Sequence, residues 1–423
     1  MNDRDEVART LDAIWRMEGA RIIAAVTRIV RDIGKAEEIA GDALVAAMEQ
    51  WPNEGTPDNP AAWLTSTAKH RAIDLVRREV NYESKQAELS HLTPSATSDQ
   101  PALDEIDAEV SGEVSDDLLR LIFVACHPVL TEEGRVALTL RLLGGLTTGE
   151  IAQAYLVAET TIAQRIVRAK RKLAYAQVPF EIPAPSELVE RLDSVLEVLY
   201  LIFNEGYSAS TGVDWVRPTL CAEALRLGRI LAELQPGQSE VHGLVALMEL
   251  QSSRLRARVS AAGKPVRLLE QNRATWDQLL IRRGLTAIER AEALDAAPGP
   301  YLLQARIAAC HAVAIDPDTT NWVRIVALYE VLLYVQPSPI VELNRIVAVA
   351  MAFGAQGALP MCEELVRSDE LTGYYLLHAV RGDLLEKLDR KSEAHDEFVR
   401  AAELTANAQE KEMLQARAKE QRN

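Results

Sequence analysis

The chain has few cysteines and few aromatic residues, and it lacks any long apolar run. It contains 423 residues, of which four are cysteines and 5% are Phe, Trp or Tyr. No apolar run approaches the roughly 20 residues that a membrane span requires. The first ten residues, MNDRDEVART, are charged and hold no secretory core. We therefore expect a cytoplasmic protein without membrane association.

The cysteines also give no metal-binding pattern. Two of them precede a histidine, but adjacent residues cannot readily close one tetrahedral site, and no matching pair completes one. We predict buried thiols and no metal site. The four are Cys126, Cys221, Cys310 and Cys362.

Signatures of catalysis are missing as well. The sequence contains no Walker loop and no G-x-S-x-G element. Glu205 and Tyr207 could form a polar site, but a helix-cap and packing role is favoured because neither has a partner base or metal. We predict that the protein is not an enzyme and uses no cofactor.

The composition predicts a globular, helical protein. Hydrophobic residues make up 48% and charged residues 26%, while Ala and Leu are abundant. The length suggests about three units at roughly 150 residues each. With 46 basic and 62 acidic side chains the net charge is −16, which argues against binding nucleic acid by charge alone. That net charge suits a DNA-binding protein that gains most of its affinity through a larger partner. It also suits one whose DNA-binding face can be masked by an acidic segment of the same chain.

The most informative stretch runs from Leu146 to Leu173 and reads LTTGEIAQAYLVAETTIAQRIVRAKRKL. Thr147 precedes Glu150 by three residues, which is a capping-box signature for a helix start. The second half has five basic residues and no acid between positions 163 and 174. One apolar face of the second helix follows at helical spacing: Ile162, Ile166, Ala169 and Leu173.

Two short helices, a tight bridge and a basic outer face predict a helix-turn-helix. Its second helix can enter a major groove, with early polar side chains on base edges and later cations on phosphates. The alternative is a helical hairpin with a solvated basic face.

The stretch resembles the promoter-reading C-terminal region of bacterial sigma-70-type factors, which ends in R-A-[RK]-x-x-L. Arg168, Ala169, Lys170 and Leu173 match that ending. Two positions depart from the family: Leu156 stands where Gly is usual in the turn, and Ala158 stands where Ser usually caps the helix, at a cost of roughly 1 kcal/mol. The resemblance implies these −35 contacts: Thr147, Thr160, Thr161, Gln164, Arg165, Arg168, Arg171 and Lys172.

The first 80 residues also predict helices. The apolar stripe of the first helix reaches Ile33, and Gly34 allows a break. An acidic helix, KAEEIAGDALVAAMEQWP, follows and is expected to end at Trp51-Pro52. Pro60 opens the next helix. The acidic helix turns Glu37, Glu38, Asp42 and Glu49 outward, and Ala36, Ile39, Ala40, Ala43, Leu44 and Ala47 inward.

This order of helices resembles conserved region 2 of the same sigma family. Gly41 replaces the usual Gln of the docking motif, and His70 replaces a usual Asn of the following helix. In that family the acidic helix docks on the clamp of RNA polymerase, which implies contacts by Glu37, Glu38, Asp42 and Leu44. The next helix reads and opens the −10 element, which implies contacts by Trp63, Lys69, His70, Arg71, Arg77 and Arg78. Trp63 could stack on a base, but a core position is favoured for a large aromatic side chain.

A polar segment follows these helices. Between Asn81 and Asp117 there are ten acidic residues against one base, Lys85, with prolines at 94 and 101. We predict an acidic flexible linker over 81–116. In the resembled family this linker threads polymerase channels; the alternative is plain solvation.

A long extension then begins. Beyond the Pro-rich connector AQVPFEIPAP, the segment LEVLYLIFNEGYSAS resembles the C-terminal extension of one subgroup of extracytoplasmic-function (ECF) sigma factors, which is tetratricopeptide-like. One repeat fits the expected offsets through Gly382, Ala394, Phe398 and Ala401. We expect stacked helix pairs that form a protein-binding or regulatory surface.

We therefore predict an all-α protein in three parts. They are sigma region 2 over 1–80, region 4 over 117–176 after the linker, and a helical-repeat regulatory extension over 185–423. The expected function is that of an alternative sigma factor whose partners are core RNA polymerase, double-stranded and melted promoter DNA, and a protein partner on the extension. A stand-alone helix-turn-helix regulator with a repeat-type sensor domain is the first alternative, and a helical scaffold is the second.

Overall fold

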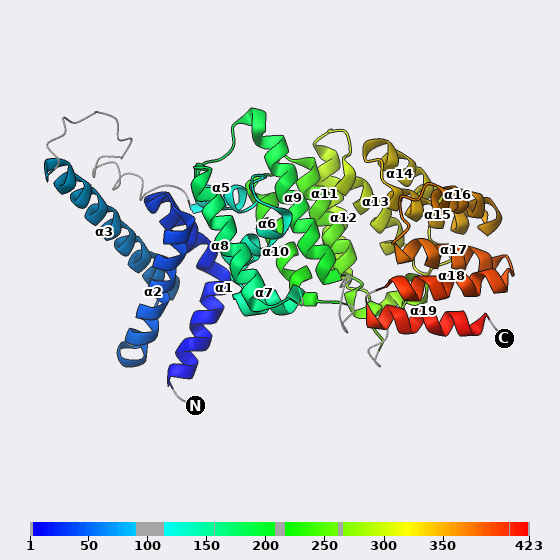
Figure 1. The fold of residues 1–423 in the computed structure, drawn as a ribbon, viewed down its shortest axis with the longest axis horizontal. Coiled ribbons are helices and arrows are strands. Elements are labelled where there is room, and N and C mark those ends of the chain that lie inside the picture. The colour runs from blue at the N-terminus through cyan, green and yellow to red at the C-terminus, as the bar shows by residue number, and fades with distance from the viewer. Residues whose placement is uncertain are drawn as a thin grey trace. The chain divides into compact units, whose positions relative to one another are not determined.

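The computed structural model forms two compact units, Met1–Val198 and Leu199–Asn423. Within its described residues every regular element is helical, and one isolated antiparallel bridge joins Val259 to Pro265 (Figure 1). The predicted all-α fold is therefore confirmed. The described residues are 3–89, 114–155, 157–207, 216–260, 265–405 and 407–421.

The first unit begins with α1 (Asp3–Val30), α2 (Ile33–Glu54) and α3 (Pro60–Leu89), which pack against one another. The break between α1 and α2 falls at Arg31, whose φ is 54°, and at Asp32, whose carboxylate accepts the Lys35 N–H. The prediction of a break at Gly34 was wrong, because the Asp32 cap places Gly34 in the first turn of α2.

The end of α2 also differs from the prediction. The helix continues through Pro52 to Glu54, and Gly55 caps it with φ 87°, donating its N–H to the Trp51 carbonyl. A left-handed glycine therefore stops the helix rather than the proline. Helix α3 begins at Pro60 as predicted, but it extends to Leu89 and so covers the first residues assigned to the linker. The remainder of the linker, residues 90–113, lies outside the described residues.

The second half of the first unit holds α5 (Val114–Ala125), α6 (Glu132–Leu142), α7 (Thr148–Tyr155) and α8 (Glu159–Tyr175). His127 and Pro128 lie between α5 and α6, and the Thr131 side chain caps α6 by accepting the Gly134 N–H. Helices α6 and α7 both pack against α8. Helix α6 thus supports the helix-turn-helix directly, and α5 packs against α6 and α1.

Helix α9 (Pro185–Tyr207) contributes residues to both units. In the first unit, Ser194 Oγ donates to the Cys126 carbonyl at 2.7 Å, and Arg191 Nη2 donates to the Phe123 carbonyl at 2.8 Å. Arg135 of α6 pairs with Glu197 at 2.9 Å. The start of α9 therefore belongs structurally to the helix-turn-helix half, although the sequence places it in the extension.

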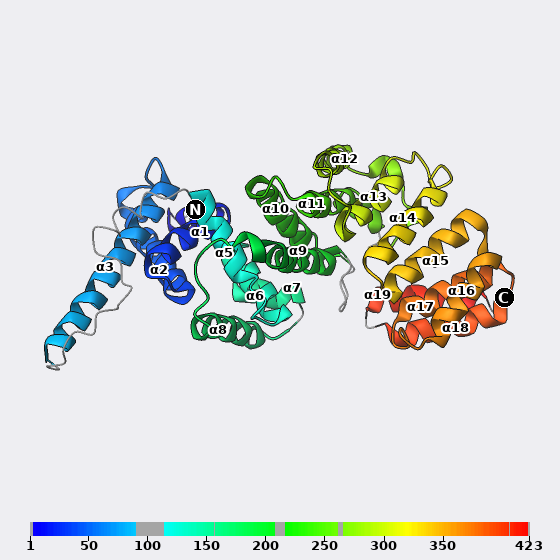
Figure 2. The same cartoon turned by 90° about the horizontal axis from the view of Figure 1, so that it is seen from above.

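The second unit consists of helices joined mostly by short connections. Consecutive helices pack as neighbours, for example α17 with α18 and α18 with α19 (Figure 2). Its elements are α10 (Pro218–Leu234), α11 (Ser239–Ser252), η1 (Leu255–Arg258), η2 (Leu268–Glu270), η3 (Arg273–Thr275), α12 (Gln278–Ala293), α13 (Pro300–Ala312), α14 (Trp322–Val335), α15 (Pro339–Phe353), α16 (Ala355–Arg367), α17 (Tyr375–Lys387), α18 (Lys391–Leu404) and α19 (Ala408–Glu420).

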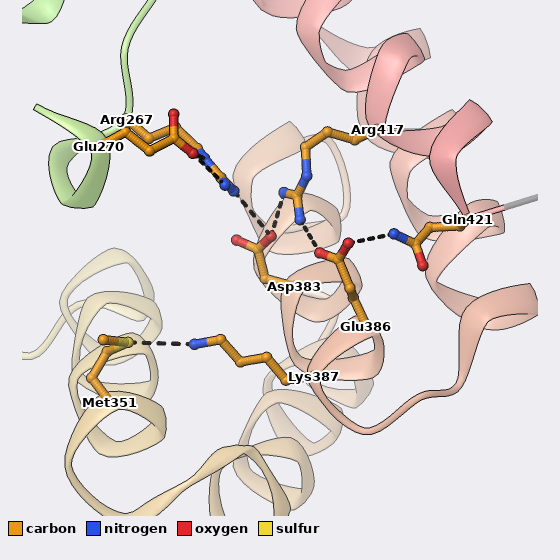
Figure 3. Close-up of polar contacts among 8 residues, drawn as sticks. All are labelled: Arg267, Glu270, Met351, Asp383, Glu386, Lys387, Arg417 and Gln421. Carbon is orange, nitrogen blue, oxygen red and sulfur yellow. Dashed lines mark hydrogen bonds and ion pairs between the residues drawn. The ribbon is translucent and has the colours of Figure 1, made fainter. Parts of the chain in front are cut away.

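The repeat predicted near the C-terminus packs as a helix pair. Gly382 on α17 and Ala394, Phe398 and Ala401 on α18 are all buried. A polar network closes the same region: Arg417 of α19 lies between Asp383 and Glu386 of α17 (Figure 3). Charged side chains thus connect α19 to α17 beside this buried helix pair.

The four cysteines are buried, as predicted. Burial raises the pKa of Cys126 to about 11, which keeps this thiol protonated and unreactive at neutral pH. Among the described helices, none combines the length and the apolar character needed to cross a bilayer.

Candidate polymerase and nucleic-acid interface

The helix-turn-helix begins with the predicted capping box. Thr147 Oγ1 accepts the Glu150 N–H at 3.1 Å, and Glu150 Oε2 accepts the Thr147 N–H at 2.8 Å. This reciprocal pair satisfies two backbone donors and fixes the start of α7. Burial raises the pKa of Glu150, but its bonds to Thr147 and Arg16 outweigh burial and lower it.

Helix α8 has one buried and one exposed face. Its inward residues are the four that the sequence predicts: Ile162, Ile166, Ala169 and Leu173. Its exposed predicted contacts are Thr160, Gln164, Arg168, Arg171 and Lys172, while Thr161 and Arg165 are half-buried. Spacings of four residues place Thr160, Gln164 and Arg168 on one side of the helix. That side offers hydrogen-bonding groups first and cations later.

The N-terminus of α8 lacks a side-chain cap. Ala158 occupies the cap position with φ −64° and ψ 142°, and no side-chain hydrogen bond is made there. The departure from the family pattern at this position therefore has the structural consequence that the sequence predicts. The other departure, at Leu156, lies outside the described residues.

Helix α3 carries the predicted −10 residues. His70, Arg71, Arg77 and Arg78 are exposed, and Lys69 is half-buried. Burial, followed by repulsion from Arg28, lowers the pKa of Lys69. These side chains place several cations along one helix, as a backbone-binding surface requires.

Trp63, the aromatic member of this set, packs against Trp51 of α2. The two rings meet edge to face with their centroids 5.5 Å apart, and Trp51 is almost fully buried. Trp63 itself is half-buried. This contact fixes the start of α3 against α2, which is the packing role that the sequence favours.

Helix α2 presents part of the predicted docking surface. Glu38 and Asp42 are exposed, and Asp42 lies 3.6 Å from the guanidinium of Arg71. Leu44 is half-buried. The exposed face also includes Val45 and Met48, each 53% exposed, which sequence reasoning missed because they interrupt a polar face. Apolar side chains beside carboxylates suit a protein partner.

Glu37, the first predicted docking residue, is not on the outer face. Its Oε1 accepts a hydrogen bond from Arg141 Nε of α6 at 2.6 Å, and its Oε2 accepts one from Lys170 of α8. Its side chain is only 13% exposed. Burial raises the pKa of Glu37, but Lys170 and Arg141 together outweigh burial and lower it. The prediction that Glu37 faces outward was therefore wrong in this compact state.

Two further ion pairs join α1 to the helix-turn-helix half. Arg16 pairs with Glu150 at 2.7 Å, and Arg28 pairs with Asp117 of α5 at 3.3 Å. Asp117 is almost fully buried, and burial outweighs its arginine partners and raises its pKa. Sequence reasoning missed Arg141, Arg16 and Arg28, because nothing local marks a partner so far away in the chain.

No group of three or more His, Cys, Asp or Glu side chains in the described part of the chain could hold a metal ion. The described helices present three distinct surfaces: an acidic and apolar face on α2, cations on α3, and a graded polar-to-basic face on α8.

Three family models match successive parts of the chain. Residues 14–81 match sigma-70 region 2, and residues 120–173 match sigma-70 region 4. Residues 191–292 match a family of unknown function (DUF6596), which lies in the extension.

Proteins similar to this chain include one uncharacterized protein and two ECF sigma factors. An uncharacterized protein of Rhizobium meliloti (strain 1021) is 42% identical over 393 residues, which cover 92% of this chain and 90% of that protein. The ECF RNA polymerase sigma factor SigK of Mycobacterium ulcerans (strain Agy99) is 30% identical over 36% of this chain and 78% of its own length. SigK of Mycolicibacterium vanbaalenii is 27% identical over 39% of this chain and 82% of its own length.

The capping box of the helix-turn-helix, the region 2 helices and these similarities all indicate the same family. The chain belongs to the ECF family of RNA polymerase sigma factors and carries a C-terminal extension.

Proposed function

We propose that this sigma factor binds core RNA polymerase through α2 and directs initiation at its own promoters, with α3 on the −10 element and α8 on the −35 element. The observation that supports this most is the exposed face of α8, where Thr160 and Gln164 precede Arg168 and Lys172. A recognition helix needs this order, because base edges are read near its N-terminus and phosphates lie beyond.

Docking is proposed to begin at the exposed carboxylates of α2. Glu38→Lys combined with Asp42→Lys should abolish binding to core enzyme and leave the helix content intact. The matched control reverses the charge of two exposed acids of the extension, by Glu364→Lys combined with Asp318→Lys. If core binding survives the α2 reversals, or is lost equally in the control, this docking surface is wrong.

Docking through the whole of α2 also requires a rearrangement. Glu37 pairs with Arg141 and Lys170, so the compact state withholds one predicted docking carboxylate and one cation of α8. We propose that core polymerase competes for Glu37, so that region 2 and region 4 separate when the holoenzyme forms. Separation would free Lys170 to join the DNA-binding face.

On α3, the exposed cations are proposed to hold the melted promoter strand. Arg77 and Arg78 lie one turn and more beyond Arg71, so a strand following the helix would meet successive positive charges. Trp63 is proposed to position the helix rather than to stack on a base, because its ring already contacts Trp51.

Run-off transcription with core enzyme and genomic DNA fragments tests the function. A sigma factor forms a holoenzyme and produces specific transcripts. A stand-alone helix-turn-helix regulator with a sensor domain would footprint DNA without core enzyme, and a scaffold would do neither. Footprints without core enzyme, together with no transcript, would refute the sigma assignment of function.

The extension is proposed to regulate promoter output, through a protein partner or by itself. Deleting everything after Tyr175 should change output strongly, but it also removes the part of α9 that bonds to Cys126 and Phe123. A second truncation after Val198 retains that part. A change of output in both truncated proteins supports regulation by the extension. A change only in the protein that ends at Tyr175 assigns the effect to the lost part of α9. Full-length output from both would refute regulation.

A further inference from the structure

The second unit contains a cavity of about 570 Å³. Its walls come from α11, α13, α14 and α15 and from Trp276, the residue after η3. The volume falls in the range of roughly 300–1,000 Å³ that small-molecule sites occupy. It is far larger than a packing defect, so its lining indicates what it could hold.

The cavity walls are mainly apolar and rich in aromatic side chains. Leu247 and Ile307 are buried aliphatic members. Trp276, Trp322 and Tyr329 are aromatic members. Rings and branched aliphatic groups at the wall of a concave site bind flat or branched apolar bodies, and they give little to a purely ionic ligand.

Arg254 is the one Arg or Lys among the described residues that line this mainly apolar space, which the amides of Gln304, Gln336 and Asn344 also line. Its Nη2 and Nε both donate to the side-chain amide oxygen, Oε1, of Gln251, at 2.5 Å and 3.2 Å. No Asp or Glu is among the described residues that line the cavity. A guanidinium has five N–H donors and one full charge, so a neutral amide oxygen leaves most of its bonding capacity for an anion.

The positive charge around Arg254 is not that of one side chain alone. Burial lowers the pKa of Arg254, and the neighbouring Arg258 and Arg273 lower it further. Tyr207 lies beneath the guanidinium, with its ring centroid 5.4 Å away. An anion bound to Arg254 would partly offset both the cost of burying its charge and the repulsion from these two arginines.

Two residues that line the cavity each have a buried ring nitrogen without a hydrogen-bond partner in the described chain. Trp276 is 4% exposed, and its indole Nε1 has no hydrogen-bond partner among the described residues. His311 Nδ1 is likewise buried without a partner in the described chain. A buried donor left without a partner costs roughly 1–3 kcal/mol, so polar groups beside this cavity are left incompletely satisfied.

We propose that this cavity binds a small amphipathic organic anion, with its carboxylate or sulfonate on Arg254 and its ring-containing body against Trp276, Trp322 and Tyr329. This inference goes beyond sigma activity and does not depend on it.

The test uses the full chain and a fluorescent anion of this class, 1-anilinonaphthalene-8-sulfonate, with neutral N-phenyl-1-naphthylamine for comparison. We expect saturable binding of one anionic probe per chain. Arg254→Gln should weaken that binding by about tenfold or more, because a charge-assisted hydrogen bond is lost. The neutral probe should bind the variant and the parent equally.

Matched variants separate the site from surface charge and from misfolding. Arg256 is exposed and lies two residues away, so Arg256→Gln should leave both probes unaffected. Arg254→Lys retains the charge and should restore most of the anion affinity. Circular dichroism and the thermal unfolding transition should match the parent in every variant used.

Three results would overturn the proposal. The first is an absence of saturable binding. The second is anion binding that Arg254→Gln and Arg256→Gln change equally. The third is binding of many probe molecules per chain, since that would place the probe on loosened apolar surface rather than in the cavity.

Discussion

Glu37 and Arg141 form an ion pair across 104 positions of the chain, with 2.6 Å between Oε1 and Nε. Lys170 of the recognition helix bonds to the other oxygen of the same carboxylate. One side chain of region 2 thus holds two cations of region 4. Glu37, which the family pattern assigns to polymerase docking, therefore also joins α2 to α6 and α8.

Removing Arg141 should loosen this closed state. Arg141→Gln takes away one partner of a largely buried carboxylate, which typically costs more than the pair itself contributes. We expect faster amide hydrogen exchange in α8 and at the start of α2. Arg165→Gln, which removes a cation of α8 that does not bond to Glu37, is the control. Unchanged exchange in α8 would mean that the pair does not hold the two halves together.

Base and phosphate contacts on α8 should respond differently. Gln164→Ala or Arg165→Ala should relax preference at particular −35 bases by roughly 1–3 kcal/mol. Arg168→Ala or Lys172→Ala should weaken all sequences alike and reduce the salt dependence. Holoenzyme binding to promoter variants at several salt concentrations measures both effects. Equal loss of base preference in all four variants would contradict the docking proposed for α8.

The missing cap of α8 can be supplied. Ala158→Ser places a hydroxyl where it can accept the N–H of Thr160 or Thr161, which should stabilise the helix-turn-helix by about 1 kcal/mol. Ala163→Ser, on the exposed helix interior, should give no gain. Thermal unfolding of the first unit, followed in the full chain, compares the two. A gain from both variants, or from neither, would contradict the cap geometry.

The close contact between α17 and α18 depends on a glycine. A Cβ on Gly382 would lie 2.6 Å from Cε1 of the fully buried Phe398 ring. Gly382→Ala should therefore destabilise the second unit by roughly 1–3 kcal/mol. A Cβ on Gly373 would meet no heavy atom of the described chain within 4 Å, so Gly373→Ala should be close to neutral. Equal denaturation midpoints for the two variants would refute the packing argument.

His311 should make the second unit sensitive to acid. Burial, with Arg254 and Arg273, lowers the pKa of His311 from 6.5 to about 3. The unfolded chain therefore binds the proton first, so the stability is present above pH 6.5 and is lost as the pH falls toward 3. The loss by pH 5 should be at most about 2 kcal/mol.

Thermal unfolding of the full chain at pH 7 and pH 5 measures this effect. His311→Gln should reduce the difference between the two pH values, whereas His70→Gln, at an exposed position, should leave it unchanged. The same pH dependence in all three proteins would show that His311 titrates normally.

Local patterns in the sequence determined much of this protein. The Thr147–Glu150 capping box, the inward face of α8 and the Pro60 helix start depend on residues within one or two turns of each other. Such features follow from helix periodicity and backbone hydrogen bonding, so they could be predicted without knowledge of the fold. The family could be identified from its motifs for the same reason, because each motif lies within a short stretch of the sequence.

Helix ends were less predictable. Gly34 and Pro52 look like breakers, yet the chain breaks at Arg31 and stops α2 at Gly55. The difference depends on which residue adopts a left-handed backbone and which side chain reaches a free N–H. Several residues in each segment could have adopted the left-handed backbone or supplied the capping side chain.

Only the tertiary structure decided what Glu37 and Arg254 face. Glu37 belongs to the outer face of an acidic helix by its spacing, but its partners are 104 and 133 positions away. Arg254 follows α11 without any motif, and the cavity it lines is built from helices that the sequence leaves unpaired. Burial and charge pairing depend on distances between segments, and the local pattern of a helix contains no information about those distances.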